Sequence, residues 1–255
     1  MTEAKGMAAA EISRGFFGVQ MHYADVLSAK AGIALADAII FHTNFHRIFA
    51  YGNLSKMAPD SEFVSLIRDV VARDDPNARI DLLIAAYADR PRDPWPSDRF
   101  PFGAHFACEA PNEAGIVRIH FRNRVNNDCF GPLHASNLAQ RRADLSEMFA
   151  FVARRWPEAK TVNGASWLYN TKGYCRLFPP EYTASRTPLV GPRPIHGLST
   201  WGQFLDFRGH VKPAIVETFK QNLNSLDPAE PWLAFPYQVL ATSAPFDAFR
   251  RHYGI

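Results

Sequence analysis

Residues 115–124 read Gly-Ile-Val-Arg-Ile-His-Phe-Arg-Asn-Arg, so apolar and polar side chains alternate along this stretch. Successive side chains of a β-strand project to opposite faces of the sheet. The apolar positions therefore share one face, which predicts a strand that packs against a core. The other face carries three arginines and a histidine, namely Arg118, His120, Arg122 and Arg124.

The segments around this strand predict a mixed α/β (α+β) sheet domain. A second strand is expected at 104–107. An amphipathic helix is expected at 138–155, with Asn137 as its N-cap and Trp156-Pro157 at its end. Further strands are expected at 161–169 and 235–242. Additional helices are expected near Thr200 and from Pro213, a residue type favoured in a first helical turn.

The N-terminal region has a different pattern and is expected to be helical. Residues 24–49 are rich in alanine and apolar on most faces. Asp60 or Ser61 can cap a further helix whose apolar residues fall on one side. Residues 80–88 fit either a helix or a strand, because their periodicity does not distinguish the two.

Four prolines between residues 91 and 101 separate these two regions. Proline excludes a regular helix and a central strand, so this segment marks a connection. We therefore expect a helical subdomain at 1–90, a proline-rich connection at 91–102 and a mixed α/β sheet domain at 103–255. One compact domain overall is the alternative, since 255 residues suit either arrangement.

Composition excludes several classes of protein. The 28 Lys and Arg residues nearly balance the 25 Asp and Glu residues, which disfavours nucleic acid as the main partner. Three cysteines without paired spacing indicate neither a disulfide framework nor a cysteine-built zinc site. No secretory signal and no membrane span is recognisable, so we expect a cytoplasmic protein.

The Arg and His face of residues 115–124 is the first candidate site. Guanidinium groups bind phosphate and carboxylate, and an imidazole moves a proton near neutral pH. A small anionic molecule is therefore the expected partner. The alternative is a solvated sheet face whose arginines pair with nearby acids.

A second group of polar and aromatic residues follows within 163–176. Ser166, Trp167, Asn170 and Arg176 are candidate substrate-binding residues, and the hydroxyls of Tyr169 and Tyr174 are candidate proton donors. The Gly-x-Ser-x-Gly turn of serine hydrolases is absent, because Leu168 stands two positions after the serine. The alternative is that the aromatic residues belong to the core.

His42 and His46 are four residues apart, the spacing at which two imidazoles on one helix can share a metal ion. Asp37 cannot easily complete such a site. It precedes His42 by five residues, and at ~100° per residue it is turned well away from His42 and lies almost opposite His46. Two satisfied histidines in a helical core are the alternative, and we expect no metal. The sequence also lacks the glycine-rich loops that bind ATP or NAD.

Several short elements between residues 118 and 180 follow one another in a distinctive order: Arg118-Ile-His120, Gly131-Pro-Leu133, the helix ending at Trp156-Pro157, Ser166-Trp-Leu168 and Pro179-Pro180. In this order and approximate spacing they resemble the C-terminal domain of a family of GNAT-like acyltransferases. The resemblance implies a half-open mixed sheet that takes an acyl-CoA-like donor. The family's Gln/Arg-x-x-Gly-x-Gly/Ala turn has no equivalent here, so arginine side chains would have to bind the donor phosphates.

These observations give three hypotheses. The first is a transferase that passes an acyl group to a small amine or alcohol, with His120 as general base, Tyr169 or Tyr174 as proton donor, and Arg118, Arg122, Arg124 and Arg176 as anion ligands. The second is a non-catalytic binding or scaffold protein that recognises an acidic partner or a metabolite. The third is a metal-dependent enzyme built on His42 and His46.

Overall fold

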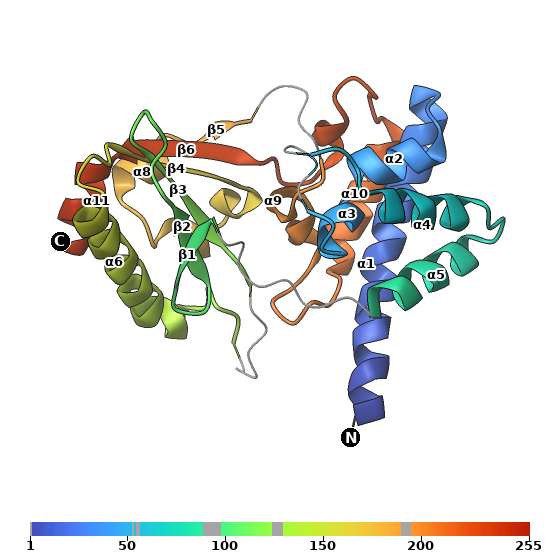
Figure 1. Cartoon of the computed structure of the whole chain (residues 1–255), viewed down its shortest axis with the longest axis horizontal. Coiled ribbons are helices and arrows are strands. Elements are labelled where there is room, and N and C mark those ends of the chain that lie inside the picture. The colour runs from blue at the N-terminus through green and yellow to red at the C-terminus, as the bar shows by residue number, and fades with distance from the viewer. Residues whose placement is uncertain (1, 53, 55–56, 89–97, 124–129, 190–194) are drawn as a thin grey trace. The chain divides into compact units, whose positions relative to one another are not determined.

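The structure is a computed structural model that describes residues 2–52, 54, 57–88, 98–123, 130–189 and 195–255. Its contacts divide the chain into two compact units. The helical unit comprises residues 1–93 and 191–237, and the sheet unit comprises residues 94–190 and 238–255. The chain thus leaves the helical unit, builds most of the sheet unit and returns to the helical unit. Residues 238–255 then complete the sheet unit (Figure 1).

This division differs from the expected one in the placement of residues 191–237, which were expected in the sheet domain. Aromatic side chains explain the difference. Tyr23 is buried against Trp201, Phe219 and Phe235, with ring centroids 5.5, 5.8 and 5.7 Å away. Large buried rings contribute strongly to a core, so they hold this later segment in the helical unit.

The helices of the helical unit are α1 (Thr2–Ala31), α2 (Leu35–His42), α3 (Phe45–Ile48), α4 (Ser61–Val71), α5 (Pro76–Ala88), α9 (Leu198–Trp201) and α10 (Pro213–Asn224), with short 3-10 helices at Gly202–Phe204 and Pro231–Ala234. Asp60 caps α4, as predicted, because its carboxylate accepts from the backbone N–H groups of Glu62 and Phe63. Residues 80–88 lie in a helix. None of the described helices combines the length and apolar composition of a membrane span.

Residues 24–49 are mostly helical, as expected, but two breaks divide them into separate helices. Gly32 has a φ of +66°, the left-handed conformation that commonly follows a helix end. Thr43 is extended, with φ −111° and ψ 173°. Its hydroxyl donates to the Ile39 carbonyl, so the chain leaves the helix at His42. The segment is therefore the end of α1 followed by α2 and α3.

In the described part of the sheet unit, six strands form one mixed sheet in the order β1-β2-β3-β4-β6-β5. The strands are β1 (Arg99–Phe102), β2 (Phe106–Glu109), β3 (Ile116–Phe121), β4 (Thr161–Ser166), β5 (Thr187–Pro188) and β6 (Leu240–Pro245). β3 and β4 are parallel, and the other neighbouring pairs are antiparallel. The predicted mixed α/β class is confirmed.

Strand β1 lies within the segment expected to be a connection. Pro101 belongs to this strand and pairs with Ala107 of β2. β1 is at the edge of the sheet, where a residue without a backbone N–H is tolerated. The edge position agrees with the expectation that the prolines of this segment exclude a central strand. Residues 91–97 lie outside the described residues.

The remaining helices of this unit are α6 (Leu138–Arg155), α7 (Lys172–Cys175), α8 (Pro180–Ala184) and α11 (Phe246–Tyr253), with 3-10 turns at Ala135–Asn137 and Trp167–Asn170. α6 has the predicted bounds. Asn137 makes no side-chain capping bond to it, because its amide donates to the Gly131 carbonyl instead. β4 ends at Ser166, three residues before the predicted end, where the second of these turns begins.

One face of the sheet carries the core of this unit. Val117, Ile119, Val162 and Ala244 are buried there with apolar residues of α6 and α11. These two helices pack against each other through Phe149 and Phe249, whose rings are 4.5 Å apart, and lie side by side along the sheet (Figure 1). The polar side chains of β3 consequently project to the opposite face.

Candidate functional site

A row of polar side chains crosses the face of the sheet opposite the α6 and α11 core. Residues paired across neighbouring strands project to the same face. Arg99 pairs with Glu109, Arg118 with Asn163, and Asn163 with Ser243. His120 pairs with Ala107, two residues before Glu109, so the β2 and β3 residues also share this face. We call Arg99, Glu109, Arg118, His120, Asn163 and Ser243 the polar row.

His120 and Glu109 form a hydrogen-bonded pair at the centre of the polar row. Nε2 of His120 lies 2.7 Å from Oε1 of Glu109, and Nε of Arg99 is 3.8 Å from the same oxygen. The hydrogen bond from His120 is the main reason that the pKa of Glu109 lies below its usual value; Arg99 and Arg118 lower it further. An ionised carboxylate only accepts, so Nε2 carries the proton and Nδ1 has the free lone pair.

Burial makes this imidazole a neutral group near neutral pH. Desolvation is the main cause that lowers the pKa of His120, while the bond to Glu109 acts in the opposite direction. The neighbouring guanidiniums of Arg99 and Arg118 also lower it. A neutral imidazole with a fixed tautomer is the form that can accept a proton.

The parallel pair β3 and β4 separates beside this histidine. Its register runs from Ile116↔Thr161 to Arg118↔Asn163 and stops there. Beyond that point, among the strands that the structure describes, residues 119–121 pair only with β2 and residues 164–166 only with β6. The backbone N–H and C=O groups with which these two segments face each other therefore make no β3–β4 ladder hydrogen bonds. We call this opening the β3–β4 split.

Asn163 lies at the last pair before the β3–β4 split. Its side-chain Oδ1 is buried, and no group among the described residues donates a hydrogen bond to it. A buried acceptor without a donor costs free energy, so such an atom in a folded protein requires an explanation. A bound donor group at the split would satisfy it.

No family model, curated protein or solved structure matches this chain.

The structure brings together only some of the residues expected on this strand. Arg118 is exposed on the polar row, two residues from His120. Arg122 follows the end of β3, where its backbone N–H donates to the His105 carbonyl at 2.8 Å. Arg124 lies outside the described residues. Of the three arginines expected in one continuous row, only Arg118 is observed there.

Tyr169 and Tyr174 are not brought together with His120. Both are buried in the core on the other face of the sheet, where the Tyr174 ring contacts the Phe121 ring at 5.5 Å. The Tyr169 hydroxyl hydrogen-bonds to the Tyr182 hydroxyl at 2.8 Å. Burial raises the pKa of both tyrosines well above the usual value. Both tyrosines thus lie where the alternative, that the aromatic residues belong to the core, would put them.

The other candidate substrate-binding residues make structural contacts. Ser166 Oγ accepts from the Leu168 N–H at the start of the 3-10 turn that contains Trp167. The Asn170 amide donates to the Trp167 and Gln238 carbonyls, both at 2.8 Å. Arg176 donates to the Leu133 carbonyl at 2.8 Å. These bonds hold the loop that follows β4.

His42 and His46 do not share one helix, because the first ends α2 and the second lies in α3. Nε2 of His46 accepts from the Asp60 N–H at 3.2 Å, and its Nδ1 donates to the Gly52 carbonyl at 3.2 Å. Both ring nitrogens are thus engaged with the backbone. Within the described ranges no group of three or more His, Cys, Asp and Glu side chains could hold a metal ion.

Glu109, Arg99 and Asn163 were not predicted as site residues. Only the pairing register of β1, β2 and β4 places them beside His120, and that register depends on contacts between distant segments. The usable sequence signal was the alternation in β3. It indicated which β3 residues share a face without naming their neighbours.

Proposed function

We propose that the sheet unit is a transferase that binds an acyl-CoA-like donor at the β3–β4 split and passes its acyl group to a small amine or alcohol. The separation of β3 from β4 beside the His120 and Glu109 pair is the observation that carries this proposal. The half-open mixed sheet implied by the resemblance to GNAT-like acyltransferases is compatible with it.

The split suits a donor with an extended chain that contains amide groups. Unpaired backbone groups at the edge of a strand readily bind an extended chain through main-chain hydrogen bonds. The pantetheine arm of coenzyme A is such a chain, because it contains two amides. One of its N–H groups would satisfy the buried Oδ1 of Asn163. Arg118, exposed on the same face, offers a guanidinium to an anionic group of donor or acceptor.

His120 would act as the general base. As the acceptor nitrogen or oxygen attacks the thioester carbonyl, its proton moves to Nδ1 of His120 and a new C–N or C–O bond forms. The C–S bond then breaks. Because a thiol has a pKa near that of cysteine, about 8.5, it can leave as the thiolate without an adjacent proton donor. This route removes the need for the tyrosines that the sequence suggested.

A second candidate function is the binding of an anionic molecule without chemistry. The exposed guanidinium of Arg118 favours it, because an open basic group is sufficient for recognition. The two functions differ in their dependence on His120. A catalyst loses turnover when the base is removed, whereas a binding protein retains its affinity.

Purified full-length protein would be tested with acetyl-CoA and a panel of amines, and release of the free thiol would be followed. We expect His120→Ala to reduce the rate by ~10²–10⁴-fold while acetyl-CoA still raises the unfolding temperature. His210→Ala is the matched control, because His210 pairs with Asp206 at 3.5 Å on an exposed surface. Wild-type protein that neither binds acetyl-CoA nor releases thiol contradicts the proposal.

A further inference from the structure

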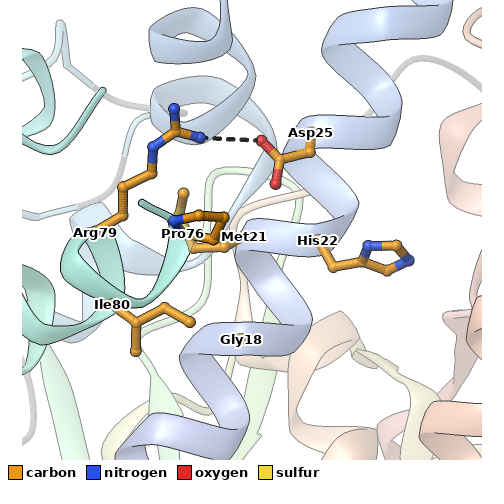
Figure 2. Close-up of a pocket in the computed structure, with 7 residues that line it drawn as sticks. All are labelled: Gly18, Met21, His22, Asp25, Pro76, Arg79 and Ile80. Carbon is orange, nitrogen blue, oxygen red and sulfur yellow. Dashed lines mark ion pairs between the residues drawn. The ribbon is translucent and has the colours of Figure 1, made fainter. Parts of the chain in front are cut away.

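A pocket of about 270 Å³ lies in the helical unit, where α1 packs on α5. It is lined by Gly18, Met21, His22, Asp25, Pro76, Arg79 and Ile80. Figure 2 shows Asp25 and Arg79 facing each other at one end, with His22 pointing away from them. The pocket therefore has a charged end, and Met21, Pro76 and Ile80 make much of its remaining lining apolar.

The two charges at this end face each other without a hydrogen bond. Nη1 of Arg79 lies 3.6 Å from Oδ1 of Asp25, beyond the usual range for N–H···O contacts. The guanidinium is held in place because its Nε donates to the Arg73 carbonyl at 2.6 Å. Burial is the main cause that raises the pKa of Asp25, although Arg79 acts against it. Both groups thus retain unused hydrogen-bonding capacity.

Gly18 leaves the apolar part of the pocket open. A glycine inside a helix is less favourable than alanine. Here an added Cβ would stand 3.7 Å from Cδ1 of Ile80, which is an ordinary contact. No steric conflict in the protein therefore requires glycine at this position.

We propose that this pocket binds a small zwitterion of the α-amino acid class, with its carboxylate on the Arg79 guanidinium and its ammonium on the Asp25 carboxylate. The guanidinium and the carboxylate of this ion pair, which lack a hydrogen bond to each other, offer one partner to each charge of such a ligand. An apolar side chain would lie over Gly18 against Met21 and Ile80. This site is independent of the polar row and of any acyl transfer.

The test uses three probes of similar size on the full-length protein. L-leucine carries both charges, 4-methylpentanoate only the carboxylate and 3-methylbutylamine only the ammonium. At ten times its dissociation constant a ligand should raise the unfolding midpoint by about 3–6 °C. We expect this rise with L-leucine and a smaller one or none with the two single-charge probes. The proposal is overturned if all three probes raise the unfolding midpoint equally. It is also overturned if L-leucine does not raise the midpoint at concentrations up to about 50 mM, roughly the limit of weak binding.

Variants separate binding from folding. Asp25→Asn should weaken L-leucine binding at least about tenfold, since a charge-assisted hydrogen bond is lost. Asp81→Asn is the matched control, because Asp81 pairs with Arg14 between the same two helices and does not line the pocket. Gly18→Leu should abolish binding while leaving the helix intact. Unchanged L-leucine affinity in Asp25→Asn or in Gly18→Leu also overturns the proposal.

Discussion

The hydroxyls of Tyr169 and Tyr182 hydrogen-bond to each other at 2.8 Å directly beside Gly164 of β4. A Cβ at Gly164 would stand 2.1 Å from the first oxygen and 2.4 Å from the second. The central strand of the sheet thus leaves room for two buried phenols that belong to later segments of the chain. Glycine is the only residue type that this arrangement permits without movement.

We therefore expect Gly164→Ala to lower the free energy of unfolding by about 1–3 kcal/mol, the usual cost of overpacking a core. Urea unfolding followed by circular dichroism would measure it. Gly18→Ala is the control, because its added methyl makes only an ordinary contact and should be neutral or stabilising. Similar decreases of the free energy of unfolding in Gly164→Ala and Gly18→Ala would contradict a steric cause.

The pair of His120 and Glu109 predicts a specific titration behaviour. Glu109 favours the protonated imidazole, so Glu109→Gln should lower the pKa of His120 further. NMR titration of the histidine would measure this shift. In the proposed transferase the rate falls as the pH drops through the pKa of the base. The variant's acid limb should therefore move to lower pH, and an unmoved limb would exclude His120 as the base.

Acid should destabilise the helical unit through His196. This side chain is buried, and burial with the nearby charge of Arg47 lowers its pKa to about 4; His46 and His42 contribute in the same direction. The unfolded state binds a proton at about pH 6.5, so stability present at neutral pH is lost as the pH falls toward 4. The loss should reach about 2 kcal/mol between pH 7 and 5.

Thermal unfolding at both pH values would measure this loss. His196→Asn should show a smaller difference between pH 7 and 5 than the wild type, whatever its absolute stability. His42 and His46 also have lowered pKa values, so some difference should remain. An equal difference in wild type and variant would mean that His196 does not titrate in this way.

The N-cap of α4 gives a prediction with a close control. Asp60→Ala removes the acceptor for the Glu62 N–H at 2.8 Å and should cost ~1 kcal/mol of stability. Asp60→Asn retains a capping oxygen and should cost much less. Either substitution leaves the Asp60 backbone N–H that donates to His46. Equal unfolding midpoints for the two variants would argue against the capping role.

Local patterns predicted the parts of the fold that local interactions determine. The alternation over residues 115–124 predicted β3, and the apolar stripe of residues 138–155 predicted the bounds of α6. Asp60 was recognised as a cap because its partners are only two and three residues away. Proline at position 213 correctly indicated the first turn of α10.

Contacts between distant residues were not predictable in this way. The bond between Glu109 and His120 depends on the register of β2 against β3. The membership of residues 191–237 in the helical unit depends on Tyr23 and its three aromatic neighbours. The helix expected near Thr200 rested on the spacing of Thr200 and Gln203, which is that of a capping box. In the fold Gln203 instead exchanges hydrogen bonds with the backbone of Tyr237, which only a tertiary contact could reveal.

The position of β6 affects how the protein folds during synthesis. β6 comes last in sequence among the described strands, yet it lies between β4 and β5 in the sheet. The helical unit likewise needs Trp201, Phe219 and Phe235 around Tyr23. Neither core can close on the ribosome until residues 201–245 have emerged. The nascent chain therefore exposes apolar surface until these residues have been synthesised, a state in which folding intermediates are prone to aggregate.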